Sequence, residues 1–117
     1  MTGVTIWHNP GCGSSKNALT YLTDRGIEPV IYLYLKEKPS REGLAALLEK
    51  LKLPASGLLR PGEALAGRLG LYEDGVDENA VLDALAAHAR LIQRPVVVSE
   101  RGAVIARPKT RIDEILP

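Results

Sequence analysis

The sequence predicts an α/β protein in which a small mixed sheet is packed between helices. Three observations support this fold class. A strand, a helix and a strand open the chain, segments with apolar helical faces fill its middle, and two joined β-prone runs precede a final helix. The 117 residues are 45% hydrophobic and 25% charged, which is close to the average of globular proteins. We therefore expect one domain over residues 1–117 and exclude a disordered chain.

The first strand is predicted over residues 4–7, where β-branched and aromatic side chains are followed by the turn-forming segment 9–11. The next segment favours a helix to about residue 25, because Ser14 or Ser15 can act as its N-cap and a glycine follows its end. The only cysteine of the chain is therefore expected in the loop at the entrance of this helix.

An apolar, β-prone run over residues 29–35 predicts a second strand, and its uninterrupted hydrophobicity is typical of a buried one. A helix follows, for which Ser40 is the expected N-cap. Its apolar residues recur at helical spacing, at Leu44, Leu47, Leu48 and Leu51. Two short helical pieces are predicted over residues 55–59 and 63–69, with a Pro-Gly turn between them.

Asp77 can cap a further helix to about residue 89, whose apolar face consists of Val81, Leu82, Leu85 and Ala89. The runs 95–98 and 103–106 predict a β-hairpin with a four-residue connection, and a last helix is expected after Pro108. This order of elements is that of a thioredoxin-like, three-layer α/β/α sandwich with a small mixed sheet.

The charge and the cysteine content of the chain limit the classes of function that it can have. Fifteen Lys and Arg residues face fourteen Asp and Glu residues, a balance that argues against nucleic acid as a partner. Cys12 is the only cysteine, so neither an intrachain disulfide nor a cysteine-rich zinc site can form. The N-terminus has no basic segment followed by an apolar run, and no apolar stretch is long enough to span a membrane. A reducing cytoplasm is the expected location.

Cys12 is the strongest candidate for chemistry. A helix entrance stabilises a thiolate, which is the reactive form of the side chain, and the same backbone N–H groups can hold an oxyanion. A dithiol motif would need a second cysteine three positions later, where Ser15 stands, and a phosphatase-type loop would need an arginine at the position of Ala18. The thiol therefore acts alone or with the thiol of a partner.

The segment HNPGCGSSKN, residues 8–17, resembles the active-site segment of glutaredoxin-dependent arsenate reductases. Three further segments are similar to the arginine-bearing segments of that family and occur in the same order: Leu58-Leu59-Arg60, Gln93-Arg94-Pro95-Val96-Val97-Val98 and Ala106-Arg107-Pro108. The resemblance extends over nearly the whole chain.

The resemblance implies that the protein reduces arsenate to arsenite in arsenic detoxification, with Cys12 as the nucleophile that forms a thiol–arsenate adduct. It also implies that glutathione attacks the adduct as a cosubstrate and that glutaredoxin is the partner that then removes glutathione. No tightly bound metal or organic cofactor is expected. Arg60, Arg94 and Arg107 are expected to bind the oxyanion, since planar guanidinium groups form paired hydrogen bonds to such oxygens.

The same resemblance implies supporting roles around the thiol. His8 is expected to help keep the thiol ionised, although a polar residue at the end of a strand is an equal alternative. Ser15 can donate to the thiolate or pair with nearby backbone, and Asn9 can shape the loop as an Asx turn or bind substrate. Pro95 is expected next to the active cysteine, after a cis Arg94–Pro95 bond.

Two other functions remain open. The superfamily includes Spx-like regulators that bind RNA polymerase and sense redox state through a cysteine pair, and the missing second cysteine argues against that sensing. A thiol protein that forms mixed disulfides with glutathione, or acts on another substrate, is the other alternative. The three arginines favour arsenate, because only an oxyanion-binding site needs them.

Overall fold

The computed structural model describes residues 3–116, and the chain divides into two compact units that are described separately below. Unit 1 takes the residues up to Glu37 and from Arg94 onward and contains β1 (Thr5–Trp7), α1 (Gly13–Thr23), β2 (Val30–Tyr32), α2 (Tyr34–Glu37), β3 (Val96–Ser99), β4 (Gly102–Ile105) and the 3₁₀ helix η3 (Lys109–Ile115). Unit 2, Lys38–Gln93, contains α3 (Arg41–Leu51), η1 (Ala55–Leu58), α4 (Ala64–Arg68), α5 (Glu78–Ala87) and η2 (Ala89–Leu91). The single domain expected over residues 1–117 stays a prediction.

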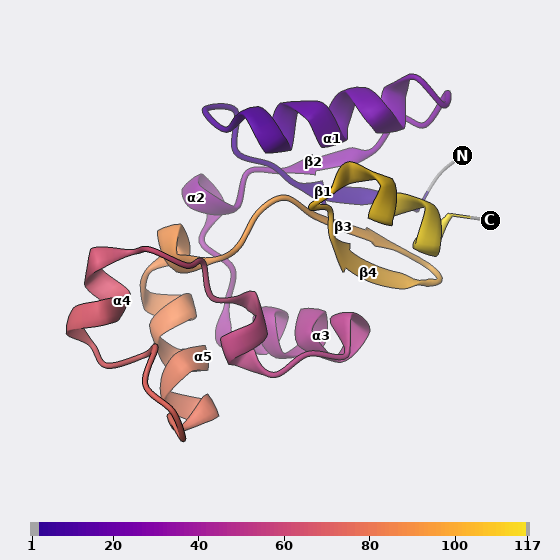
Figure 1. Ribbon diagram of the computed structural model, residues 1–117. Coiled ribbons are helices and arrows are strands. Elements are labelled where there is room, and N and C mark those ends of the chain that lie inside the picture. The colour runs from indigo at the N-terminus through magenta and orange to yellow at the C-terminus, as the bar shows by residue number, and fades with distance from the viewer. Residues whose placement is uncertain (1–2, 117) are drawn as a thin grey trace. The chain divides into compact units, whose positions relative to one another are not determined.

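The sheet of unit 1 is mixed, as predicted, with strand order β2-β1-β3-β4 (Figure 1). β1 and β2 are parallel because α1 forms the crossover between them, and Ile6 pairs with Ile31. On its other side β1 pairs antiparallel with β3, with Ile6 opposite Val97, and the hairpin adds β4. The predicted sequence of a strand, a helix and a strand, then helices, a hairpin and a terminal helix is confirmed.

The prediction that the second strand is buried is wrong. Within residues 3–116, β2 is an edge strand that pairs with β1 alone, and Val30 and Ile31 are 64% and 47% exposed. The strand is also shorter than the predicted run of residues 29–35, because the chain enters α2 at Tyr34. Tyr34 is the buried residue of the run, and its ring stacks on Trp7 with 6.2 Å between the centroids. Burial of an apolar run thus depends on its place in the sheet, which periodicity does not reveal.

The core of unit 1 lies between the sheet and two helices. In Figure 1, α1 and the C-terminal segment, drawn in yellow, lie on the same side of the sheet. The interior consists of aliphatic side chains from all of these elements: Val4, Ile6, Ala18, Leu22, Ile27, Val97, Val104, Ala106, Ile112 and Ile115. This packing fixes α1 over the sheet and so fixes the position of its N-terminus.

The last segments differ in detail from the prediction. The hairpin connection has two residues and not four, because Ser99 and Gly102 already pair in the ladder. The terminal helix begins after Pro108 as expected but is 3₁₀ rather than α. A 3₁₀ helix places every third residue in line, and Ile112 and Ile115 both point into the core.

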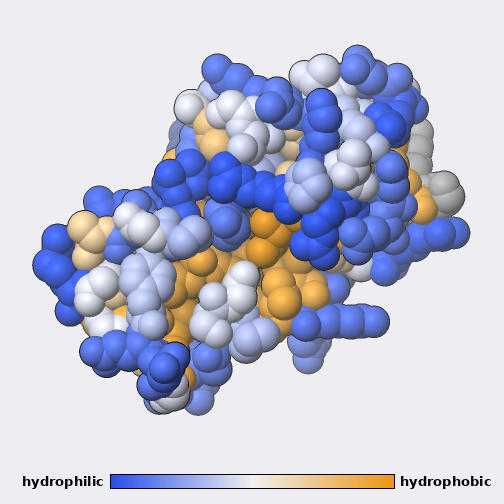
Figure 2. Space-filling model, viewed as in Figure 1, coloured by the Kyte–Doolittle hydropathy of each residue, from blue (hydrophilic) through white to orange (hydrophobic). Residues whose placement is uncertain are grey.

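Unit 2 is helical, and its predicted caps are confirmed. Ser40 Oγ accepts a hydrogen bond from the Gly43 backbone N–H at 3.0 Å at the start of α3, and Asp77 caps α5 through Asn79. α5 ends at Ala87 and not at residue 89, where η2 begins instead. Figure 2 shows hydrophobic surface beside α5. A cavity of about 350 Å³ also adjoins α5 and is lined mainly by Leu69, Leu71, Ala80, Ala84 and Ala87.

Among the residues described, no helix has the length and hydropathy needed to cross a membrane.

Truncation of Leu22 tests the packing of α1. Leu22 is fully buried, so Leu22→Ala should lower the free energy of unfolding by about 2–5 kcal/mol through lost burial and a residual cavity. Leu35→Ala is the matched control in the same unit, because Leu35 is 39% exposed, and should cost less than about 1 kcal/mol. Denaturant unfolding of both variants measures the difference, and equal losses would contradict the described core.

Candidate active site around Cys12

The loop after β1 delivers Cys12 to the start of α1. Asn9 forms the predicted Asx turn, in which its Oδ1 accepts from the Gly11 backbone N–H at 2.9 Å, and the Cys12 N–H donates to the Asn9 carbonyl at 3.0 Å. Cys12 is itself the N-cap residue, with an extended backbone and a carbonyl that accepts from the Lys16 N–H at 3.0 Å. The prediction of Ser14 or Ser15 as the N-cap is therefore wrong, since both already lie in the first turn.

The environment of Cys12 favours its thiolate. Burial raises the pKa of the thiol, but this effect is outweighed by the backbone N–H groups of Ser15 and Ser14 and by the charge and hydrogen bond of the Arg94 guanidinium. The pKa of Cys12 is lowered overall. The N–H groups of a first helical turn have no partner within the helix, so they are free to stabilise negative charge at this place. Cys12 is thus a buried sulfur with the electrostatics of a nucleophile.

Sheet topology explains why Arg94 lies beside Cys12. β3 runs antiparallel to β1 with Val96 opposite Trp7, so the two residues before β3 lie at the end of β1 where the Cys12 loop begins. Arg94 is buried, and the Arg94–Pro95 peptide bond is cis, as the family resemblance implied. The Pro95 carbonyl accepts from the Ala106 N–H at 2.9 Å, which ties this segment to the end of β4.

Arg107 reaches the site from the same end of the sheet. Ile105 of β4 pairs with Val96 of β3, so Arg107 follows β4 at that edge. Its Nη2 donates to Ser14 Oγ at 2.7 Å. The Arg107–Pro108 bond is also cis, which the sequence did not indicate. Two arginines from the two ends of one hairpin therefore meet the first turn of α1.

His8 and Ser15 are buried and joined to each other, with 2.6 Å between His8 Nδ1 and Ser15 Oγ. Ser15 Oγ also accepts from the Asn9 backbone N–H at 3.0 Å. The Ser15 hydroxyl thus holds the loop, and it is the Ser15 backbone N–H that acts on the thiol. Burial lowers the pKa of His8, and the charge of Lys16 lowers it further. Near neutral pH, His8 is an uncharged hydrogen-bonding group and not a cation beside the thiol.

Arg60 belongs to unit 2, where it follows η1. Its backbone is fixed on both sides. The N–H donates to the Leu91 carbonyl at 2.8 Å, and the Arg60 carbonyl accepts from the Tyr72 hydroxyl. Tyr72 Oη in turn accepts from the Glu63 N–H. The placement of the Arg60 guanidinium next to Cys12 stays a prediction.

Sequence reasoning missed the part played by Ser14. Its backbone N–H lowers the pKa of Cys12, while its hydroxyl anchors Arg107. The signal was present, because two serines follow the cysteine closely at a helix entrance, but Ser14 was interpreted only as a possible cap. Between residues 3 and 116, no three His, Cys, Asp or Glu side chains are grouped as metal ligands would be.

The ionisation of His8 can be measured by NMR titration of its ring. Its pKa should lie below the usual 6.5, so the unfolded chain binds the proton more tightly than the folded protein does. The free energy of unfolding should therefore fall as the pH drops below 6.5. Lys16→Gln should move the midpoint upward without reaching 6.5, because burial is the larger cause. Lys36→Gln, which does not act on His8, should leave it unchanged. A midpoint above 6.5 in the parent protein would overturn this assignment.

Known proteins resemble the chain over its whole length. The sequence model of the ArsC family matches residues 7–115. An arsenate reductase of Escherichia coli is 38% identical over 117 residues, which cover 100% of this chain and 83% of that protein, and one of Neisseria meningitidis is 36% identical over 99% of this chain and 100% of its own. The solved structure of an arsenate reductase from Vibrio cholerae superposes with a TM-score of 0.92 at 37% identity and covers 97% of both chains. These matches confirm the predicted fold class, and the chain belongs to the ArsC family.

Proposed function

We propose that this protein is an arsenate reductase that uses Cys12 as its nucleophile. The observation that carries the proposal is the placement of the thiol, which lies at the N-terminus of α1 next to the Arg94 guanidinium and has a lowered pKa. Relatives named arsenate reductase match the full length of the chain at 38% identity, which supports the same substrate. Dihydrogen arsenate is a tetrahedral oxyanion, and first-turn N–H groups with guanidinium groups are the donors that such an anion needs.

In the first step, the Cys12 thiolate attacks arsenic. An As–S bond forms and the As–O bond to one hydroxyl group breaks. That hydroxyl group takes the proton of the second arsenate hydroxyl and leaves as water. Arg94 and Arg107 would stabilise the charge that gathers on the remaining oxygens, and we assign Arg60 the same role. His8, Ser15 and Asn9 are assigned to holding the loop, since their hydrogen bonds join one another and the backbone around Cys12.

We assign the reducing electrons to two thiols, that of glutathione as a cosubstrate and that of glutaredoxin as a partner. Glutathione displaces a second arsenate oxygen as water and forms an As–S bond. Glutaredoxin then attacks the glutathione sulfur, and the electron pair of the broken As–S bond stays on arsenic, which becomes As(III). Water releases arsenite and restores Cys12, and one mixed disulfide is formed per arsenate. We further propose that the protein needs no tightly bound cofactor and works in a reducing cytoplasm, where thiols stay reduced.

A coupled assay tests the proposal. With glutathione, glutaredoxin, glutathione reductase and NADPH, oxidation of NADPH should require arsenate and should fall more than about a thousandfold in Cys12→Ser, because the nucleophile is lost. Circular dichroism checks that the variant is folded. Arsenate-independent oxidation, or turnover retained by Cys12→Ser, would contradict the proposal and favour a thiol protein with another substrate or a regulatory partner.

The role of Arg94 is tested by Arg94→Lys, which keeps the charge but loses the planar fork. We expect kcat/KM for arsenate to fall by about tenfold to a hundredfold, as when one donor to a developing oxyanion is removed. Arg101→Lys is the matched control at the hairpin tip, where Arg101 donates to the Leu116 carbonyl, and should stay within about twofold. Equal kinetics of Arg94→Lys and the parent protein would rule out the proposed role.

A further inference from the structure

A small polar cavity lies in unit 1 beside the first turns of α1. It is lined by Ser14, Asn17, Ala106, Arg107, Pro108 and Lys109, and its volume is about 210 Å³. This space is many times the volume that a single water molecule needs, so the cavity can admit a group larger than water. The cavity adjoins the candidate active site, because Ser14 belongs to both: its N–H acts on the Cys12 thiol and its hydroxyl is bonded to Arg107.

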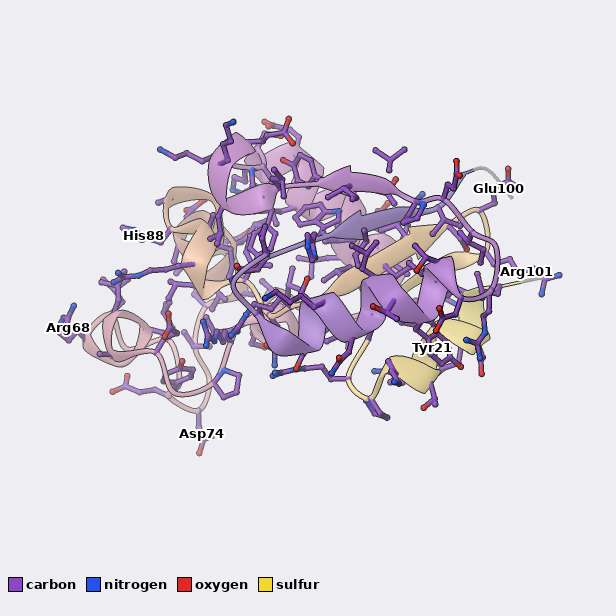
Figure 3. The ribbon with its side chains drawn as sticks, turned by 90° about the horizontal axis from the view of Figure 1, so that it is seen from above. Tyr21, Arg68, Asp74, His88, Glu100 and Arg101 are labelled. Carbon is purple, nitrogen blue, oxygen red and sulfur yellow. The ribbon has the colours of Figure 1, made fainter. Side chains whose placement is uncertain are left out.

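The lining of the cavity carries two positive charges and no negative charge. Arg107 is held at Ser14, and Lys109 forms no ion pair with any carboxylate of the described residues. The neighbouring acid, Asp113, has other partners. It accepts from the Tyr21 hydroxyl and lies 3.9 Å from Arg25 Nε. Figure 3 labels Tyr21 on α1, facing the C-terminal segment. The Lys109 ammonium lies 5.9 Å from the centre of the same ring, so it is positioned but not neutralised.

The chemistry of the cavity suits a carboxylate attached to a peptide. Lys109 offers a charged donor to the carboxylate, and the Asn17 amide can both donate to and accept from a peptide group. Lys109 and Asn17 are not among the residues assigned to arsenate, so the cavity provides donors beyond those that the oxyanion uses. A second thiol must reach the arsenic bound at Cys12, and glutathione carries a carboxylate on each side of its thiol.

We propose that the cavity lined by Ser14, Asn17, Arg107 and Lys109 binds a carboxylate of glutathione and so directs its thiol toward Cys12. This inference rests on the proposed function, because it assigns a place to the cosubstrate of that reaction. Lys109 is then a specificity residue for the thiol substrate and not for arsenate.

Binding can be measured without turnover, in Cys12→Ser protein titrated with S-methylglutathione and followed by NMR. We expect the largest shifts at the amides of Asn17 and Lys109, and binding about fivefold weaker when Lys109→Gln is added, as for loss of one partly exposed charge pair. Lys109→Arg, which keeps the charge, should bind nearly as the parent does. Arg101→Gln is the control for an exposed cation elsewhere in unit 1, since Figure 3 places Arg101 at the hairpin tip. Shifts confined to other residues, or equal affinity of Lys109→Gln, would overturn the proposal.

Kinetics provides the second readout. In Lys109→Gln, KM for glutathione should rise about fivefold, while KM for arsenate and kcat at saturating glutathione should change less than about twofold. A rise in KM for arsenate instead would assign Lys109 to the oxyanion and contradict the inference. If the parent protein does not turn over arsenate, the proposed function fails, but Lys109-dependent binding of S-methylglutathione still decides whether the cavity is a carboxylate site.

Discussion

The structure depends on the way in which a buried thiolate is stabilised where strand β1 passes into helix α1. Removing the sulfur from water raises its pKa, and a thiol in that position would be inert without compensation. The compensation comes from donors fixed by the fold, namely the first-turn N–H groups of α1 and the Arg94 guanidinium. Because these donors are already in place, little reorganisation is needed when negative charge develops.

The remaining parts of unit 1 can be understood as support for this arrangement. The aliphatic core fixes α1 over the sheet, and the antiparallel pairing of β3 with β1 brings Arg94 to the end of the strand that leads to Cys12. β4 returns Arg107 to the same edge, where Ser14 holds it. His8 contributes as a hydrogen-bond partner of Ser15, which holds the loop in shape, and burial lowers the pKa of His8 and so favours its neutral form. One sheet order therefore gathers residues that are far apart in the sequence.

The sequence predicted those features that local chemistry determines. Ser40 and Asp77 are caps because their side chains reach backbone donors two or three residues away, and the leucine spacing of α3 marks its buried face. The element order and the mixed sheet followed from the same signals. The position of Cys12 at a helix entrance was predicted from the turn formers around it, and the cis bond at Pro95 came only from the family resemblance.

Features that depend on long-range pairing could not be predicted in this way. The prediction that β2 is buried was wrong because strand order, and not local sequence, places a strand at the edge of a sheet. The N-cap of α1 was misassigned because loop dihedral angles decide which residue starts a helix. The anchoring of Arg107 by Ser14 joins residues that are 93 positions apart, so no local pattern contains it. The resemblance to a family indicated which residues belong to the site, whereas the strand pairing explains why Arg94 and Arg107 lie near Cys12.

A pH titration of thiolate ultraviolet absorbance, with Cys12→Ser protein as the blank, measures directly whether the fold stabilises the thiolate. The chain has one cysteine, so the signal reports a single group. We expect a midpoint clearly below about 8.5 in the folded protein and a return to about 8.5 in denaturant, where the helix and Arg94 no longer act. A folded-state midpoint at or above about 8.5 would show instead that burial outweighs the backbone N–H groups and Arg94.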